Sequence, residues 1–179
     1  GPLSLSPQRI AQQLQLAPDN FAENLPLALD AHHAGEWRLD GETLIWTDEI
    51  EVGGALALAI EIERLQLPEG ANLLVGDENW QGPLQRAQLF TRHQAGSRLK
   101  LRAEVPRAAA SAFALQIVAV QAAYRDPFAV APGVNAKASD PCRLNAACEA
   151  DAQIQQWGSA VVALQVLNTT SCTGTLMNN

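Results

Sequence analysis

Hydrophobic and polar residues alternate along several short stretches of this chain, and turn residues separate these stretches. The clearest run extends from Leu56 to Leu67, where Leu and Ile recur at every second position and the pattern slips once before Leu65. Alternation with a period of two is typical of a half-buried strand. The pattern predicts strands at 25–29, 36–39, 43–47, 56–67, 71–75, 84–90, 98–105 and 113–120.

Turn residues between these stretches indicate how the strands follow one another. Asp40-Gly41 is a strong hairpin signal, and it joins two short arms that carry Trp37 and Trp46. Further breaks are expected at 68–70, 76–79, 82–83 and Pro106. Several strands separated by turns at intervals of about ten residues predict an antiparallel β-sandwich over about residues 20–125.

A short helix is expected before the sandwich, at Ser6–Leu14. Ser6 suits the capping position and Pro7 the first helical position, and Ile10 and Leu14 lie one turn apart on one face. The first four residues, Gly1–Ser4, look like the remnant of a removed purification tag and are not expected to take part in the fold. The first structural unit is therefore expected at 5–125.

The character of the chain changes after Tyr124. Residues 126–141 are rich in Pro, Gly and small polar residues without periodicity, which predicts a linker. A new strand is expected at Ala160–Leu167, within a last segment, 142–179, that is too short to complete a domain. We therefore expect the chain to end within a domain, at Cys172–Asn179, as a fragment of a larger protein.

Composition narrows the classes of partner. The chain has 179 residues, of which 47% are hydrophobic, so it has enough apolar side chains for a core. Its net charge is −7 and it has no basic stripe, which makes nucleic acid and anionic membranes poor partners. No stretch of eighteen apolar residues is present, so no membrane span is expected.

The sequence of the last segment resembles a known family. It contains Cys142 and Cys148 with five residues between them, then an apolar strand, then Cys172-Thr-Gly-Thr-Leu-Met-Asn-Asn. This order resembles the first strands of the mature catalytic domain of bacterial lysyl endopeptidases, which are secreted serine proteases with a chymotrypsin-like double barrel. The β-rich part before it, including Trp37, Leu44-Ile45-Trp46 and Leu67 to Leu73, is similar to the pro-region of such precursors.

The resemblance implies a function, a location and several site residues. It implies a pro-region that keeps a bacterial, secreted or periplasmic, trypsin-like endopeptidase latent or assists its folding. It also implies that Cys142, Cys148 and Cys172 pair with downstream cysteines, although pairing of Cys142 with Cys148 is an alternative. The partner would be the remainder of the protease domain, as part of the same precursor or as a separate chain after nicking.

A processing site is expected in the linker. Lys137-Ala138 lies just before Cys142, near the start of the family's mature chain, so a lysine-preferring parent enzyme could cut itself there. Lys100 and Lys137 are the two lysines of the chain, and this scarcity would protect the pro-region from the same activity. The alternative is that Lys137 is an ordinary surface lysine.

A serine protease needs a histidine base and an acid beside its nucleophile, and these catalytic residues are not expected within this chain. There is no Gly-Asp-Ser-Gly segment, and the histidines do not stand in the family's catalytic context. We therefore expect no hydrolytic activity from the chain alone, and no cofactor.

Other candidate sites have an ordinary structural alternative. His32-His33 beside Asp30 suggests a metal site or a solvated loop, and Asp77-Glu78-Asn79 suggests a calcium site although it lacks a calcium-loop pattern. Three tryptophans suggest a carbohydrate-binding face or, more simply, core and hairpin packing: Trp37, Trp46 and Trp80. His93 is expected in a polar loop, and the acceptor-like Asn168-Thr169-Thr170 is interpreted as chance.

Two further functions are open beside the pro-region. The sandwich could be a carbohydrate- or protein-binding module attached to a protease or to an inactive protease-like domain. It could also be only an export or solubility element.

Overall fold

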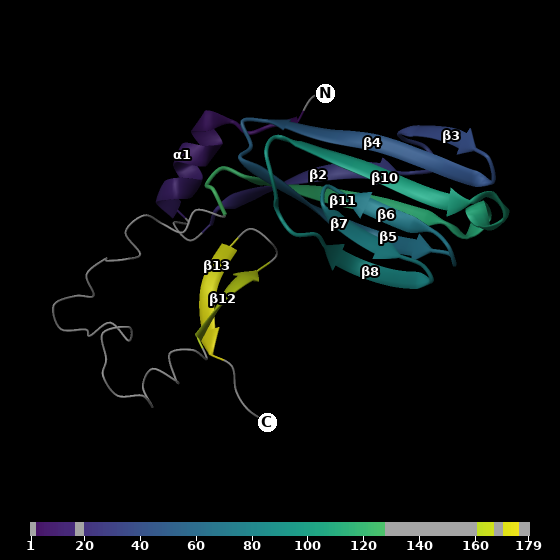
Figure 1. The fold of residues 1–179 in the computed structure, drawn as a ribbon. Coiled ribbons are helices and arrows are strands. Elements are labelled where there is room, and N and C mark those ends of the chain that lie inside the picture. The colour runs from purple at the N-terminus through teal and green to yellow at the C-terminus, as the bar shows by residue number, and fades with distance from the viewer. Residues whose placement is uncertain (1–2, 17–19, 128–160, 167–169, 176–179) are drawn as a thin grey trace.

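A computed structural model describes residues 3–16, 20–127, 161–166 and 170–175, and it shows a mostly β protein with a short N-terminal helix (Figure 1). The helix, α1, spans Pro7–Leu16, so Pro7 holds the predicted first position. A short 3-10 helix, Arg107–Ala112, connects two later strands and was not expected. The predicted mostly β fold with a short N-terminal helix is confirmed.

Sheet one contains six strands. They lie in the order β1 (Leu3–Ser4), β4 (Thr43–Gly53), β10 (Arg98–Pro106), β6 (Asn72–Val75) and β7 (Glu78–Gln81), with β3 (Glu36–Asp40) also paired to β4. The predicted hairpin is present, because Trp37 lies opposite Trp46 and Leu39 opposite Leu44. Gly41 in its turn has a φ of +61°, which glycine adopts readily.

Sheet two contains five strands. They lie in the order β2 (Ala22–Asp30), β11 (Ala114–Ala123), β5 (Ala57–Leu67) and β8 (Leu84–Phe90), with β9 (Gln94–Ala95) also paired to β5. All pairings of this sheet are antiparallel. A separate hairpin is formed by β12 (Val161–Val166) and β13 (Thr170–Thr175), within the last segment where a strand was expected.

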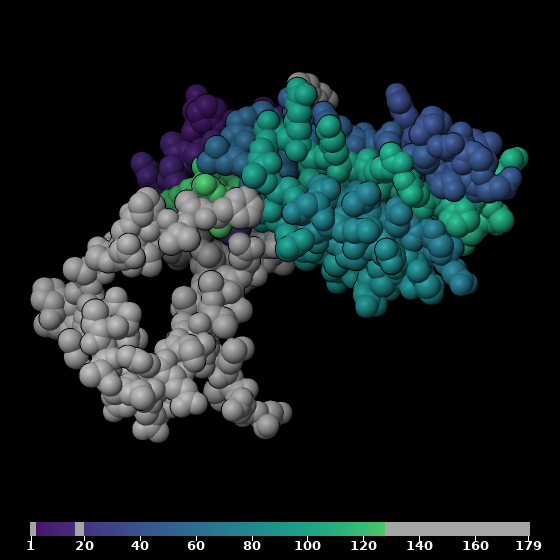
Figure 2. Space-filling view, in the orientation of Figure 1, coloured from purple at the N-terminus to yellow at the C-terminus, as the bar shows by residue number. Residues whose placement is uncertain are grey.

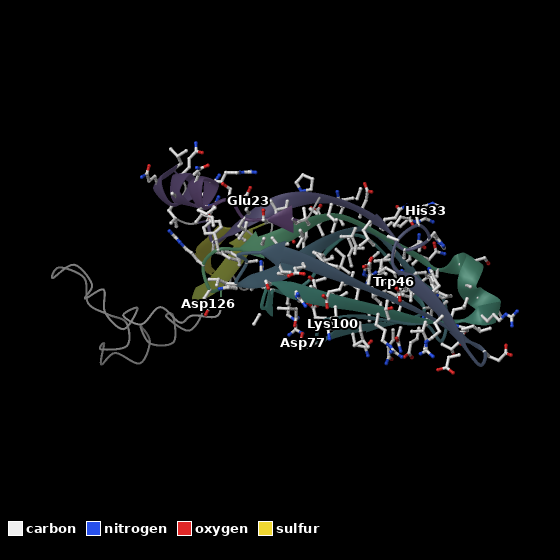
Figure 3. All side chains as sticks on the ribbon, turned by 90° about the horizontal axis from the view of Figure 1, so that it is seen from above. Glu23, His33, Trp46, Asp77, Lys100 and Asp126 are labelled. Atoms are coloured by element: carbon white, nitrogen blue, oxygen red, sulfur yellow. The ribbon has the colours of Figure 1, made fainter. Side chains whose placement is uncertain are left out.

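The hydrophobic core lies between the two sheets, as the alternation predicts. Leu99, Leu101, Ala103 and Val105 of β10 are buried, whereas the residues between them face outward. Figure 3 shows the Trp46 side chain between the layers. Burial of these apolar side chains is the main term that holds the sheets together.

The slip in the hydrophobic pattern of β5 corresponds to a β-bulge. Ile62 and Leu65 are both fully buried, and Glu63 and Arg64 between them are exposed. The pairing of β5 with β11 changes register at this point, because Ile117 lies opposite Ile62 and Gln116 opposite Arg64. An extra residue in one strand restores the inward direction of the following apolar residues.

Four details differ from the sequence-based expectation. Leu3–Ser4, set aside as a tag remnant, pairs in parallel with Val52–Gly53 of β4. Leu56 was expected to begin the buried alternation, but its side chain is 51% exposed. Glu78 and Asn79 were expected in a turn, and they begin β7 instead because they pair with Val75 and Leu74. In α1, Leu14 is 40% exposed, and Ile10 packs against the core.

Candidate functional site

An open groove of about 600 Å³ lies on the outer face of sheet one, the face turned toward the viewer in Figure 2. It runs across β4, β10 and β6, and the start of β3 forms one rim. Its lining consists of Gly35, Glu36, Thr47, Asp48, Glu49, Leu74, Gly76, Lys100, Leu101 and Arg102.

Strand periodicity places the charged side chains of this groove. Since Leu99, Leu101 and Ala103 point into the core, Lys100 and Arg102 point outward. Lys100 lies opposite Glu49 of β4, and Arg102 lies between Thr47 of β4 and Leu74 of β6. At the rim, Gly35 has a φ of +75° and brings its backbone close to Trp46.

Several charges at the groove are paired. Arg102 donates to Glu104 at 2.6 Å, and this bond holds the pKa of the Glu104 carboxyl below its usual range. Arg98 lies 3.2 Å from Glu51 and 3.9 Å from Glu49. Lys100 forms no ion pair with any described residue. The groove therefore offers an unneutralised ammonium group beside several carboxylates.

The lining of the groove combines apolar, hydroxyl and charged side chains. It contains no His, Cys or Ser, and its one hydroxyl belongs to Thr47. It also contains no aromatic ring. The apolar residues Leu74 and Leu101 lie among positively and negatively charged side chains, and this combination suits an extended peptide better than a neutral sugar.

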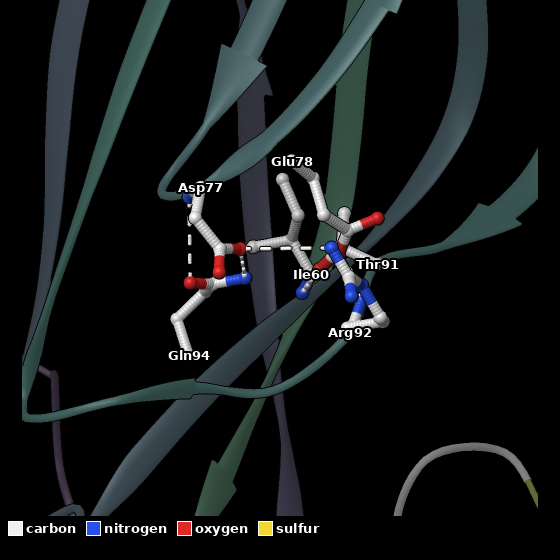
Figure 4. A network of polar contacts seen from close by, with 6 residues as sticks. All are labelled: Ile60, Asp77, Glu78, Thr91, Arg92 and Gln94. Carbon is white, nitrogen blue, oxygen red and sulfur yellow. Dashed lines mark hydrogen bonds and ion pairs between the residues drawn. The ribbon is translucent and has the colours of Figure 1, made fainter.

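The acidic turn that suggested calcium is held by contacts within the chain (Figure 4). Arg92 donates its backbone N–H to the Glu78 carboxylate, and the Gln94 amide donates to Asp77. The Arg92 guanidinium lies 3.7 Å from Glu78 and 3.8 Å from Asp77. These contacts join β7 of sheet one to the segment between β8 and β9 of sheet two, so the geometry indicates a structural role.

The histidine pair lies at the end of β2. The His32 ring nitrogen Nε2 lies 3.0 Å from the Phe113 carbonyl oxygen, while His33 lines a second pocket of about 420 Å³ with Asp30 and Glu63. The backbone N–H of His32 donates to Asp30 and lowers the pKa of that carboxyl. The described residues contain no group of three His, Cys, Asp or Glu side chains placed to hold a metal ion.

His93 corrects a sequence-based expectation. It was expected in a polar loop, but only 7% of it is exposed, and its ring meets Phe21 edge-on at 5.1 Å between ring centres. Burial lowers its pKa to about 4. The residues next to His93 in sequence are polar, so the local pattern did not indicate that its side chain is buried. Its burial depends on residues distant along the chain.

The tryptophans pack rather than form one binding face. Trp46 is fully buried and donates its indole N–H to the Ala34 carbonyl oxygen at 2.8 Å. Trp37 donates to the Ala31 carbonyl oxygen at 2.8 Å and meets Phe113 edge-on, while Trp80 packs against the core. Of the two interpretations, packing is confirmed, since a buried Trp46 has no surface to offer a sugar.

The residues singled out by the family resemblance are mostly not among those described. Lys137, Ala138, Cys142 and Cys148 lie outside the described ranges. The backbone of Cys172 lies in β13, opposite Leu164 of β12. None of the described helices is long and apolar enough to cross a membrane.

Comparison with models of protein families, with curated protein sequences and with solved structures finds no match for this chain.

Proposed function

We propose that residues 5–125 are the pro-region of a secreted or periplasmic bacterial serine endopeptidase of the trypsin-like class. The sandwich keeps the protease domain latent or assists its folding, and the last segment is the start of that protease domain. Its partner is the remainder of the same protease. The support from sequence is the order of Cys142, Cys148 and Cys172-Thr-Gly-Thr after a β-rich unit.

The observation that carries the proposal is the position of Lys100. It lies in β10, which pairs with β4 on one side and β6 on the other, and its carbonyl oxygen accepts from the Gly76 N–H at 2.9 Å. A protease needs a locally opened chain, so a peptide bond inside a sheet resists cutting until the sheet opens. The folded pro-region therefore resists a lysine-specific enzyme at Lys100. Lys137, the other lysine of the chain, lies after the pro-region in sequence.

The test uses the full chain and the mature protease released from its precursor. Increasing amounts of the chain are added while hydrolysis of a short lysine peptide is followed. We expect inhibition that fades as the chain is cut after Lys137, and longer inhibition by the Lys137→Gln variant. An unchanged hydrolysis rate at every concentration, together with no rise in the refolding yield of the protease, would overturn the proposal.

A second function is favoured by the groove on sheet one. Its mixed charges and the unpaired Lys100 fit a protein-binding module, the alternative in which the sandwich recruits the protease to a partner. In that case Lys100→Gln would weaken binding of an extended peptide that contains both acidic and basic residues. Arg38→Gln, outside the groove, would leave this binding unchanged. Inhibition of the protease that is insensitive to Lys100→Gln would favour the pro-region instead. Binding to cell-wall glycans without inhibition would favour a carbohydrate module.

A further inference from the structure

Strand pairing defines which residues of sheet two share a face. Residues directly opposite each other on neighbouring strands point to the same side of a sheet. Two rows belong to the inner face, because their residues are part of the core between the sheets. The first row is Leu25, Val120 and Ile60, and the second row contains Ala122 and Leu58. The rows that alternate with these belong to the outer face: Ala22, Ala123 and Ala57; Asn24, Gln121 and Ala59; Pro26, Ala119 and Glu61.

Most of this outer face is buried along β5 and β11. Ala57, Ala59, Gln121 and Ala123 have no exposed surface, and Ala119 is only 4% exposed. The face is open along part of β2, because Asn24 and Pro26 are exposed, and Glu61 of β5 is half-buried. The outer face of a two-layer sandwich normally meets water, so its polar positions remain exposed. A further layer must therefore cover this part of sheet two, which we name the alanine face.

Neighbouring residues account for only part of this cover. Phe21 forms a small cluster with Ala22, Ala57 and Ala123, and its ring reaches His93. Phe21 and His93 are each only 7% exposed, so they too lie beneath other atoms. Helix α1 serves the opposite face, because Arg9 pairs with Glu23, which lies opposite Ala122, and Ile10 packs against the main core.

Buried polar atoms on this face lack partners among the described residues. Gln121 donates its amide to Asn24 at 3.1 Å, but its carbonyl oxygen Oε1 accepts no hydrogen bond there. Both ring nitrogens of His93 are likewise without a described hydrogen-bond partner. Buried polar atoms are normally satisfied, so the covering layer is expected to bring polar groups as well as apolar contact.

We propose that the hairpin β12–β13 is the third layer and that it packs on the alanine face. A two-stranded hairpin is marginal in water and needs another surface to be stable. The two strands, Val161–Val166 and Thr170–Thr175, contain no charged residue, which suits a face of alanines and one amide. Small side chains also allow two backbones to approach closely. Figures 1 and 3 both place β12–β13 at the end of the sandwich where α1 lies.

The proposed contact is independent of the proposed protease function, because it concerns only how the hairpin meets the sandwich within this chain. It implies that β12–β13 and the unit at 5–125 are in direct contact through sheet two.

Photo-crosslinking of the full chain tests the contact. Phe21 is replaced by p-benzoylphenylalanine, whose benzophenone group crosslinks to neighbouring residues under ultraviolet light, and the products are mapped by mass spectrometry. We expect crosslinks from position 21 to residues 161–175. The matched control places the same residue at Leu39, which is 49% exposed on β3, and should give none to that segment. Crosslinks between two molecules, or only within 5–125, would overturn the proposal.

The titration of His93 gives a second measurement that does not need an altered sandwich. The variant with Val162→Pro and Ala163→Pro removes hydrogen bonds from β12 and disrupts the hairpin. We expect the pKa of His93, followed by NMR in the full chain, to rise from about 4 toward 6.5 as its ring becomes hydrated. An unchanged His93 pKa in a variant whose β10 amides remain protected from exchange would contradict the proposal.

Discussion

At the scale of single residues, a few positions are determined by what lies close to their backbone. Gly35 and Gly41 both have a positive φ, of +75° and +61°. A side chain at Gly41 would meet nothing within 4 Å, whereas a Cβ at Gly35 would collide with Trp46 Nε1 and lie 2.7 Å from the Thr47 carbonyl oxygen. The two glycines therefore share a conformation and differ in surroundings.

This difference predicts unequal costs for the same substitution. Gly41→Ala should cost about 1 kcal/mol of unfolding free energy, the strain of a left-handed alanine. Gly35→Ala should cost about 3 kcal/mol, because the collision with the Trp46 and Thr47 atoms is added. Urea unfolding followed by tryptophan fluorescence measures both. Equal costs would show that the Gly35 backbone shifts freely and that the contact with Trp46 is not tight.

His93 predicts a dependence of stability on pH. Burial holds its pKa near 4 in the folded chain, below the 6.5 of an unburied histidine, so the unfolded chain takes up the proton first as pH falls. The His93 contribution is fully present above pH 6.5 and is lost as pH falls from 6.5 to about 4, by at most about 3 kcal/mol.

Urea unfolding of His93→Phe at several pH values checks this contribution. A phenylalanine fills the same site without a proton, so the variant should lose less stability between pH 6.5 and 4 than the native chain. Leu39→Gln, at an exposed position without a titratable side chain, is the control and should retain the native pH dependence. A His93→Phe curve parallel to the native curve would contradict the expected role of His93.

At the scale of elements, Thr91 substitutes for a strand partner. Between β8 and β9, its N–H donates to the Ile60 carbonyl oxygen at 3.0 Å, and its hydroxyl accepts from the Ile60 N–H at 2.9 Å. The side chain thus satisfies the backbone of β5 where regular pairing with β8 stops. Thr91 is 2% exposed, so water does not replace it.

Thr91→Val and Thr91→Ser separate the shape of this side chain from its hydrogen bond. Valine has the same shape but leaves the Ile60 N–H unpaired, which should cost about 1–3 kcal/mol. Serine keeps the hydroxyl and loses one methyl group, at about 0.8 kcal/mol or less. Faster amide exchange at Ile60 in the valine variant alone would identify the bond. A serine variant less stable than the valine variant would contradict this reasoning.

At the scale of the whole molecule, sheet order decides which peptide bonds are accessible. The Lys100 side chain is exposed, but its backbone lies in β10, between β4 and β6. Cutting after Lys100 therefore requires opening of the whole of sheet one, which unfolds with the core.

Digestion with a lysine-specific protease measures this protection. In native buffer we expect cutting after Lys137 and intact 1–137, whereas in urea the enzyme should cut after Lys100 as well. Mass spectrometry distinguishes the fragments. A fragment ending at Lys100 under native conditions would show that β10 opens locally, and it would remove the support that Lys100 gives to the proposed function.

The sequence by itself determined the local elements, because strand alternation and turn chemistry depend on neighbours along the chain. The hairpin through Asp40-Gly41 and the inward residues of β10 could be predicted in this way, and the slip in the pattern before Leu65 marks the position of the bulge. The helix start at Pro7 follows from the same local rules.

Only the tertiary structure decided which strands share a sheet and which faces are covered. The groove around Lys100 was missed because it depends on pairing between β4, β10 and β6, which are far apart in sequence. Burial of His93 and of the alanine face was missed for the same reason, since alternation predicts one buried face and cannot indicate a third layer. Local patterns specify where a side chain points, and only the assembled sheets determine what it meets.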